Sequence, residues 1–126
     1  MAQVAGSQAI DLWLEAYKAA WASGDGVVDL FTPEARYFTA PYRPPIIGGD
    51  AIEAWWIAQG ESDTRWLFEH EVIAVDGSLN VVQGTTTYPD SVGPTGGPQV
   101  YYNLWLITLN DTGRASEFIE YWMLPE

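Results

Sequence analysis

The fold of this chain is decided by Tyr101–Thr108 (YYNLWLIT), Asn110–Arg114 (NDTGR) and Glu117–Trp122 (EFIEYW). The outer segments alternate as strands do, and the middle segment contains the glycine of a turn. Asn103 and Glu120 stand in these strands among large aromatic residues. Polar groups interleaved with Trp and Tyr on one strand face can line a cavity instead of filling a solid core. The stretch therefore predicts a small-molecule pocket, but it does not say which molecule.

Alternation with a period of two runs through the second half of the chain. Asp76-Gly77 is a hairpin signal, and Asn110–Gly113 suits a slightly longer turn, so the strands that they join must be antiparallel. The strands predicted in this way are Thr64–Val75, Ser78–Tyr88, Pro98–Asn110 and Arg114–Leu124. The Gly- and Pro-rich segment Pro89–Pro98 is either a mobile lid or an inert hairpin tip.

The first half of the chain has helical periodicity. Ser7 is a suitable N-cap for a first helix, and Ser23-Gly24 is a suitable end. The apolar stripe of this helix consists of Ile10, Trp13, Leu14, Tyr17, Ala20 and Trp21.

Two more helices are predicted before the strands begin. A short one over Asp25–Phe31 is capped by its aspartate and stopped by Thr32-Pro33. Another covers Asp50–Gly60, where Asp50 and Glu53 resemble a capping box.

A brief strand, Ala35–Ala40, and an irregular loop, Pro41–Gly49, lie between these two helices. Helices followed by a meander of strands predict an α+β fold, with the helices packed on one face of a curved sheet. With 126 residues, the chain is expected to form a single domain spanning residues 1–126.

The chain carries a formal net charge of −12, from five basic and 17 acidic side chains. Nucleic acids and anionic membrane surfaces require clustered Lys and Arg, whereas the five basic residues here are scattered, so neither is expected as a partner. The absence of Cys and the single His exclude disulfides, thiolate metal sites and a multi-His zinc site within one chain. A metal site made only of carboxylates remains formally open, but no EF-hand loop is present, so no metal is expected. Nucleotide-binding glycine motifs are also absent, so no cofactor is expected.

Neither a signal peptide nor an uninterrupted apolar stretch of about 18 residues is recognisable. A cytoplasmic protein is therefore expected.

Four phrases occur in a particular order: Tyr17–Asp25, Phe31–Ala35 (FTPEA), Gly48–Ile52 (GGDAI) and Gly113–Trp122. Together they resemble the NTF2-like superfamily, specifically its SnoaL-like and ketosteroid-isomerase-like branch, over nearly the whole chain. The resemblance implies a cone in which three N-terminal helices pack on a strongly curved, mainly antiparallel sheet that encloses a pocket, and it implies a homodimer. It leaves the chemistry open, because one fold hosts many functions.

His70 is the first candidate for catalysis. Strand alternation places it on one face with Trp66, Phe68, Val72 and Ala74, and therefore pointing inward. It is either a buried histidine satisfied by one hydrogen bond or a general acid or base near neutral pH.

Glu120 shares a strand face with Phe118 and Trp122. Facing inward, its carboxylate needs a partner or a proton, because an unpaired buried charge is costly; facing outward, it is an ordinary surface residue. If both side chains point inward, Glu120 and His70 form a plausible carboxylate–imidazole pair.

Two further polar residues are candidate hydrogen-bond donors. Asn103 either orients a substrate carbonyl or only ties the sheet together. Tyr17, eight residues before Asp25, matches the helix position of the oxyanion tyrosine in steroid isomerases, but it also lies on the apolar stripe of its helix.

Aromatic residues make up 14% of the chain, and they either fill the core or wall a ligand site. Those predicted to bind a substrate are Trp21, Tyr37, Trp56, Phe68, Tyr88, Tyr101, Trp105, Phe118 and Trp122, with Tyr42 as a further wall residue.

The departures from the resembling enzymes limit the chemistry. Where steroid isomerases have a general-base Asp before a Pro, this chain has Ala40-Pro41, and where they have a protonated acid it has Trp105. No Arg falls on a predicted pocket face, as the Asp-Arg-Asp epoxide hydrolases require, and one His does not match the two-His scytalone dehydratases. Polyketide cyclases use a pocket carboxylate with assistance from a His. His70 and Glu120 are the nearest analogue of that arrangement in this chain, although they do not match a motif.

The leading hypothesis is a cofactor-independent enzyme that acts on a small apolar, oxygenated molecule by cyclisation, isomerisation, dehydration or epoxide opening. His70 and Glu120 are its acid–base pair, with Asn103 and Tyr17 as donors. The alternative is a non-catalytic domain that binds a small ligand or dimerises, and a third hypothesis is a protein-transport adaptor.

Overall fold

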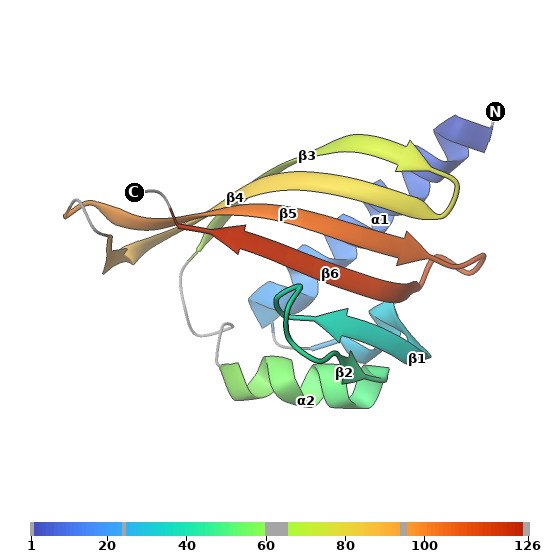
Figure 1. Cartoon of the computed structure of the whole chain (residues 1–126), viewed down its shortest axis with the longest axis horizontal. Helices are drawn as coiled ribbons and strands as arrows, with labels where there is room; N and C mark the ends of the chain where they lie inside the picture. Colours follow the sequence, from blue (N-terminus) through green and yellow to red (C-terminus); the bar gives the residue numbers. More distant parts are fainter. Residues whose placement is uncertain (1, 24, 60–65, 94–95, 125–126) are drawn as a thin grey trace.

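The structure is a computed structural model that describes residues 2–23, 25–59, 66–93 and 96–124. Within these ranges it has two α-helices, one 3-10 turn and a six-stranded sheet (Figure 1). In chain order the elements are α1 (Ala2–Ser23), η1 (Val28–Leu30), β1 (Phe31–Phe38), β2 (Ile46–Ile47), α2 (Gly49–Gln59), β3 (Leu67–Asp76), β4 (Leu79–Val92), β5 (Pro98–Leu109) and β6 (Ala115–Met123).

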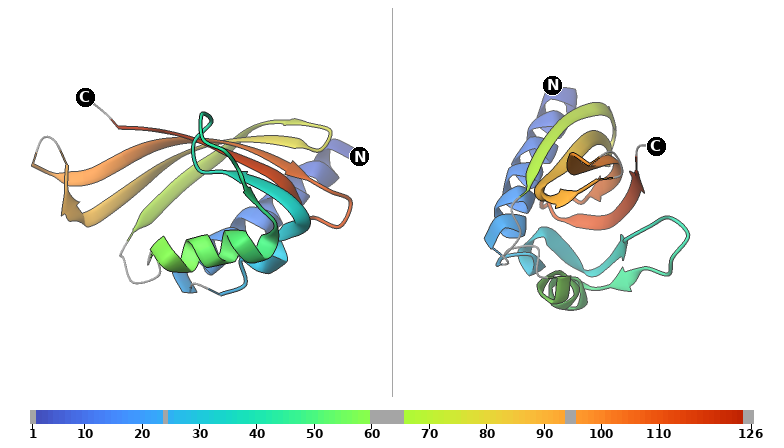
Figure 2. Two further views of the ribbon diagram at one scale, coloured as in Figure 1. Left: turned by 60° about the horizontal axis from the view of Figure 1, so that its bottom comes forward. Right: turned by 90° about the vertical axis from the view of Figure 1, so that its left-hand side faces the viewer.

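The sheet has the strand order β2-β1-β6-β5-β4-β3. All neighbouring strands are antiparallel except β1 and β6, which run parallel. Figure 2 shows the sheet curling, with α1 along one face and α2 beyond the β1–β2 edge. The predicted α+β class, with helices on a curved and mainly antiparallel sheet, is confirmed. The predicted count of three helices is not confirmed: the described residues contain two α-helices, and the predicted short helix is the 3-10 turn η1.

The first helix is longer than predicted. It starts at Ala2, so Ser7 lies inside the helix and is not its N-cap. Ala2, Gln3 and Ala5 favour helix over coil, which explains the earlier start. The last described residue of the helix is Ser23, and the predicted stop at Gly24 lies outside the described residues. The predicted apolar stripe is buried along its whole length.

The predicted second helix is only the single turn η1. The residue that precedes this turn is Val27, which forms no side-chain cap, so Asp25 does not cap it. Phe31 already has extended backbone angles and begins β1. Two β-branched residues, Val27 and Val28, and the positive φ of Gly26 explain why a longer helix does not form here.

The first strand begins earlier than predicted and contains Pro33. A proline cannot donate to the ladder, and here the pairing with β6 is interrupted between Phe31 and Arg36, so no hydrogen bond is lost. Within the predicted irregular loop, Ile46–Ile47 form the short strand β2. Gly48 follows with a φ of 92°, and α2 begins one residue before the predicted Asp50. The predicted end of α2, Gly60, lies outside the described residues.

The four long strands confirm the predicted meander. Gly77 and Gly113 have positive φ angles of 59° and 82° in the two predicted turns. β4 continues to Val92 and β5 begins at Pro98, so five of the ten residues of the predicted loop Pro89–Pro98 belong to a strand. An irregularity between Tyr88 and Val92 accommodates Pro89. The predicted first residues of β3, Thr64 and Arg65, lie outside the described residues.

The core lies between α1 and the concave face of the sheet. Gly84 has a particular role there, because a Cβ at this position would come within 2.6 Å of the Phe68 ring. The missing side chain lets Phe68 lie over β4 and stack on Trp105, with 4.7 Å between ring centroids. The predicted inward position of Ala74 is wrong: a register shift between Val72 and Ala74 reverses the alternation and leaves Ala74 exposed.

Among the described helices, none is long and apolar enough to cross a membrane.

Candidate functional site

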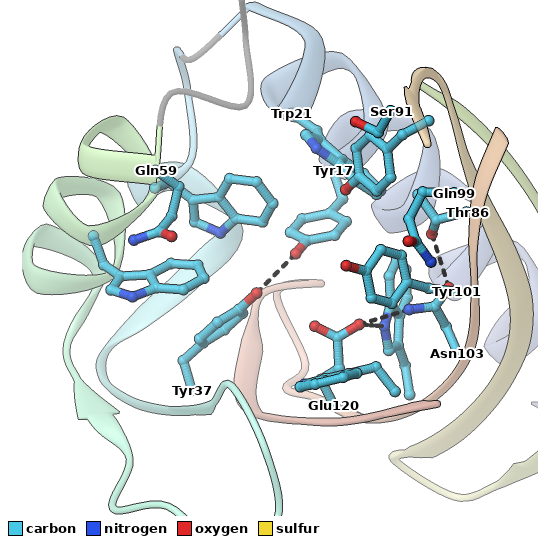
Figure 3. Close-up of a pocket in the computed structure, with 15 residues that line it drawn as sticks. Tyr17, Trp21, Tyr37, Gln59, Thr86, Ser91, Gln99, Tyr101, Asn103 and Glu120 are labelled. Atoms are coloured by element: carbon cyan, nitrogen blue, oxygen red, sulfur yellow. Dashed lines mark hydrogen bonds between the residues drawn. The ribbon is translucent and has the colours of Figure 1, made fainter. Parts of the chain in front are cut away.

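A cavity of about 560 Å³ lies between the C-terminal half of α1, α2, β1 and the concave face of β4 to β6 (Figure 3). Most of its wall consists of aromatic rings: Tyr17, Trp21, Tyr37, Trp55, Trp56, Tyr88, Tyr101, Trp105 and Trp122. The remaining lining residues are polar: Gln59, Thr86, Ser91, Gln99, Asn103 and Glu120.

The Glu120 carboxylate is fixed on the sheet side of this cavity. Its Oε2 accepts a hydrogen bond of 2.8 Å from the indole Nε1 of Trp105 and one of 2.9 Å from the Asn103 Nδ2. Trp105 is directly opposite Glu120 in the β5–β6 register, so the strand pairing itself brings the two side chains together. Of the two sequence-based alternatives for Glu120, the inward-facing one therefore applies.

A third strand extends this network. The Thr86 hydroxyl on β4 donates to the Asn103 Oδ1 at 2.8 Å, so Asn103 lies between Thr86 and Glu120 (Figure 3). The side chains of Thr86 and Asn103 are 2% and 7% exposed. Buried polar groups are stable only when they are paired, and this chain of hydrogen bonds pairs them across three strands.

Two phenols form the opposite wall of the cavity. The hydroxyls of Tyr17 on α1 and Tyr37 on β1 are hydrogen-bonded to each other at 3.0 Å. Burial raises the pKa of the Tyr17 phenol well above its ordinary value, and the nearby Tyr37 and the Glu120 carboxylate raise it further. Tyr17 is therefore protonated at neutral pH and is able to donate a hydrogen bond.

Ring packing holds the aromatic wall rigid. Tyr17 meets Trp56 and Trp105 edge to face, with centroids 5.7 and 5.4 Å apart, and Trp21 stacks on Trp66 at 4.1 Å. Trp66 is not part of the cavity lining. Such contacts favour a preformed cavity, because the rings have few conformations to lose when a ligand binds.

His70 does not line the cavity. It stacks on Phe68 at 5.3 Å, and its electrostatic neighbours are Lys18, Glu15 and Asp11 of α1. Burial lowers the pKa of His70 and Lys18 lowers it further, while the two acids act in the opposite direction. The structure therefore does not bring His70 into the cavity beside Glu120.

Three other predicted wall residues lie elsewhere. Phe68 and Phe118 belong to the solid core, where their side chains are 6% and 0% exposed. Tyr42 is 75% exposed and is not part of the lining. The lining does include the other predicted residues: Tyr17, Trp21, Tyr37, Trp56, Tyr88, Tyr101, Asn103, Trp105, Glu120 and Trp122.

Five lining residues were missed in the sequence, although signals for most of them exist. Thr86 and Gln99 lie two positions from Tyr88 and Tyr101, so strand alternation places them on the cavity side. Gln59 follows the predicted wall residue Trp56 by three positions and so shares its helix face, whereas Trp55, the fifth missed residue, is only its chain neighbour. Ser91 lies within the irregularity of β4, where alternation does not apply.

No three His, Asp or Glu side chains come together as a possible metal site in the described parts of the chain. Glu120 carries the only formal charge among the described lining residues. The chemistry that this wall supports is therefore proton transfer at one carboxylate, assisted by hydrogen bonds from phenols.

The sequence profile of the SnoaL-like domain matches residues 14–118. The chain belongs to the SnoaL-like domain family. This match covers the C-terminal part of α1, all of α2 and the strands up to Phe118. No curated protein matches the sequence.

Solved structures of low sequence identity, among them one named NTF2-like, share the fold of this SnoaL-like domain. The epoxide hydrolase/cyclase-like enzyme SalBIII, with a role in pyran ring formation in the polyether salinomycin, has a TM-score of 0.73 at 15% identity and covers 96% of this chain and 92% of its own. An NTF2-like protein of unknown function from Burkholderia xenovorans has a TM-score of 0.70 at 19% identity, with coverages of 95% and 87%. At these identities, the likeness establishes the fold alone.

Proposed function

We propose that this SnoaL-like domain is a cofactor-independent enzyme that carries out acid–base chemistry on a small, apolar, oxygenated molecule. The observation that carries the proposal is the Glu120 carboxylate, held by the N–H groups of Trp105 and Asn103 in the wall of an aromatic cavity. A carboxylate in such surroundings can accept a proton from a bound molecule and return it at another atom.

The reaction begins with a carbon acid whose carbonyl oxygen lies near the Tyr17–Tyr37 pair. Glu120 removes a proton from the carbon next to the carbonyl, and the electron pair moves onto the oxygen. A phenol hydroxyl donates a hydrogen bond to the resulting enolate without transferring its proton. When the substrate also has a carbon–carbon double bond beyond that carbon, the enolate is conjugated with it, and the Glu120 carboxylic acid protonates the far carbon of the double bond; the double bond moves next to the carbonyl, and the carboxylate is regenerated. Cyclisation, dehydration and epoxide opening are other uses of the same carboxyl group.

The likeness to SalBIII supports the choice of an oxygenated substrate, since that enzyme is described as epoxide hydrolase/cyclase-like. The proposed acid–base group is Glu120 alone, because His70 lies outside the cavity lining. Asn103 acts in this proposal as a hydrogen-bond donor to Glu120.

The test combines turnover and binding on a panel of neutral probes: 2-acetonaphthone, a bicyclic lactone and styrene oxide. NMR in D₂O follows exchange of the protons next to the carbonyl and consumption of each probe, while tryptophan fluorescence follows binding. We expect Glu120→Gln to lower turnover at least about 100-fold. The matched control is Glu69→Gln, which removes the same charge from an exposed position of β3 and leaves turnover unchanged. Equal turnover in Glu120→Gln and the native protein contradicts the proposal.

A second candidate is a domain that binds the small molecule without transforming it. Two N–H donors on one oxygen stabilise the charged carboxylate and thereby weaken it as a base, which favours this candidate. If a probe quenches the tryptophan fluorescence but NMR shows neither proton exchange nor consumption of any probe, the protein is a binding domain and not an enzyme for these probes.

We also propose a homodimer, formed through the outer face of β5 and β6. Tyr102 pairs with Met123 and Leu104 with Tyr121 on the face opposite to Asn103. The Tyr102, Tyr121 and Met123 side chains are 49%, 36% and 51% exposed, and none is charged. In a chain with a net charge of −12, this uncharged part of the face, which lies toward the end of β6 away from Glu117, lets a second copy approach with little charge repulsion. Analytical ultracentrifugation is expected to show a dimer that Tyr102→Lys dissociates; a native monomer contradicts it.

A further inference from the structure

Thr86 and Asn103 are deeply buried, yet they lie in the cavity wall. In the β4–β5 register Asn103 is opposite Gly84, two residues before Thr86. Alternate residues share a strand face, so Thr86 and Asn103 are diagonal neighbours on the cavity side. A threonine at this position is not needed to fill an apolar core, and its hydroxyl has a defined partner.

The direction of the hydrogen bonds gives this threonine a specific effect. A carboxamide presents an acceptor oxygen at one end and a donor NH₂ at the other. Thr86 Oγ1 donates to the oxygen of Asn103 at 2.8 Å, and the NH₂ of Asn103 consequently points to Glu120 Oε2 at 2.9 Å. In Figure 3 the two bonds form one continuous chain from Thr86 to the Glu120 carboxylate.

The groups around Glu120 make its ionisation sensitive to this chain. The titratable side chains that face the cavity from other elements are phenols: Tyr17 on α1, Tyr37 on β1, Tyr88 on β4 and Tyr101 on β5. The Trp105 N–H binds the same Oε2 from β5. A donor that binds only the ionised carboxylate favours that form, and the Asn103 NH₂ is such a donor as long as its orientation is held.

We propose that Thr86 is a positioning residue: by donating to the Asn103 oxygen it keeps the Asn103 NH₂ on Glu120 and so keeps Glu120 ionised. This inference rests on the proposed function only for its catalytic consequence, because the ionisation of Glu120 exists without a substrate. Hydrogen bonds that follow one another in a buried chain polarise each other. The Thr86 hydroxyl therefore also strengthens the hydrogen bond from the Asn103 NH₂ to Glu120, in which it takes no direct part.

Thr86→Val is the informative variant. Valine keeps the shape and the strand propensity of threonine, but it leaves the buried Asn103 oxygen without a donor. The carboxamide is then free to rotate its oxygen toward a protonated Glu120. Thr86→Ser restores the hydroxyl and is the matched control, and Asn103→Leu removes the intermediate residue itself.

The experiment measures the titration midpoint of Glu120 by NMR of the ¹³C-labelled carboxyl carbon in the unliganded protein. We expect Thr86→Val to raise the midpoint by about one pH unit and Thr86→Ser to leave it unchanged. Thr86→Val combined with Asn103→Leu is expected to shift it no further than Asn103→Leu alone, because the two residues act as one unit. An unchanged midpoint in Thr86→Val, or full additivity of the two shifts, overturns the proposal.

Two supporting measurements separate the possible failures. If Thr86→Val does not fold, the side-chain NH₂ signal of Asn103 in the native protein must move during the Glu120 titration, and an unmoved signal overturns the proposal. The pH–rate profile then tests the catalytic consequence: the acidic limb of Thr86→Val is expected to move to higher pH by the same interval as the NMR midpoint, about one pH unit. If Thr86→Val shifts the Glu120 midpoint but the native protein turns over none of the probes, Thr86 remains a positioning residue and the proposed enzymatic function is rejected.

Discussion

The concave face of the sheet has two ends that differ in what lies between it and α1: a hollow end at Asn103, which lines the cavity, and a packed end at Ile107, which belongs to the core. Along β5 the inward residues change from Tyr101 and Asn103 at one end to Ile107 and Leu109 at the other. Ile107 is completely buried in the core, whereas Asn103 lines the cavity. Aliphatic side chains pack closely, because a void between them would cost van der Waals contacts. At the cavity, hydrogen bonds hold ring side chains in the two walls instead: Tyr17 to Tyr37 in one wall and Trp105 to Glu120 in the other. Strand alternation says which residues face inward, and their chemistry decides whether they form a core or a cavity.

The largest expected effect distinguishes these two ends within one strand. Phe118 and Trp122 share the inward face of β6, but Phe118 is 0% exposed and Trp122 is 42% exposed at the cavity. We expect Phe118→Ala to lower the free energy of unfolding by about 3–5 kcal/mol. Trp122→Ala is expected to lower it by less than about 1 kcal/mol and to weaken the binding of 2-acetonaphthone. Urea unfolding and fluorescence titration measure the two quantities, and equal destabilisation by both substitutions contradicts the distinction.

Much of the hollow end was predictable from the sequence. The alternation of Asn103 with Trp105 and of Phe118 with Glu120 placed these residues on inward faces. The pairing of Trp105 with Glu120, by contrast, depends on the turn between the strands and on the register that it sets, which the sequence leaves open. Thr86 was missed because a threonine in a strand is ordinary, and its role arises only from its diagonal position relative to Asn103.

The predicted pairing of His70 with Glu120, which required both side chains to meet in one pocket, is not formed in the structure, because His70 does not line the cavity. His70 and Glu120 both face inward, but they lie three strands apart, on β3 and β6 at opposite sides of β4 and β5. Alternation gives the face of a residue and not the position of its strand across the sheet, so the sequence could not tell that two strands separate His70 from Glu120. The predicted short helix over Asp25–Phe31 is only the turn η1, because Gly26 has a positive φ and the two valines that follow it disfavour a helix.

His70 provides a smaller test of the same comparison. We expect His70→Gln to leave turnover of any accepted probe within about twofold of the native rate, since general acid–base groups contribute far more. A loss as large as that in Glu120→Gln returns His70 to the active site and contradicts the placement of the site over β4 to β6, away from β3.

The pH dependence of stability gives the smallest expected effect. The pKa of His70 in the folded protein is lower than its ordinary value of 6.5. Below about pH 6.5, the unfolded chain therefore holds a proton on His70 more often than the folded protein does. The contribution of neutral His70 is therefore fully present above pH 6.5 and is lost as the pH falls toward the folded pKa. Thermal unfolding from pH 7.5 to 5 is expected to show a slightly larger decrease in Tm for the native protein than for His70→Gln; parallel curves contradict the shift.

The most direct test of the account uses the tryptophan side chains as reporters of where a ligand binds. The chain has seven Trp residues, of which Trp21, Trp55, Trp56, Trp105 and Trp122 line the cavity. Trp13 lies in the core, and its indole N–H is bonded to the Leu30 carbonyl at 2.9 Å. An NMR titration of the assigned indole N–H signals with 2-acetonaphthone is predicted to shift the five cavity signals and leave that of Trp13 in place. A shift of Trp13 with unmoved cavity signals would contradict the placement of the functional site at the hollow end.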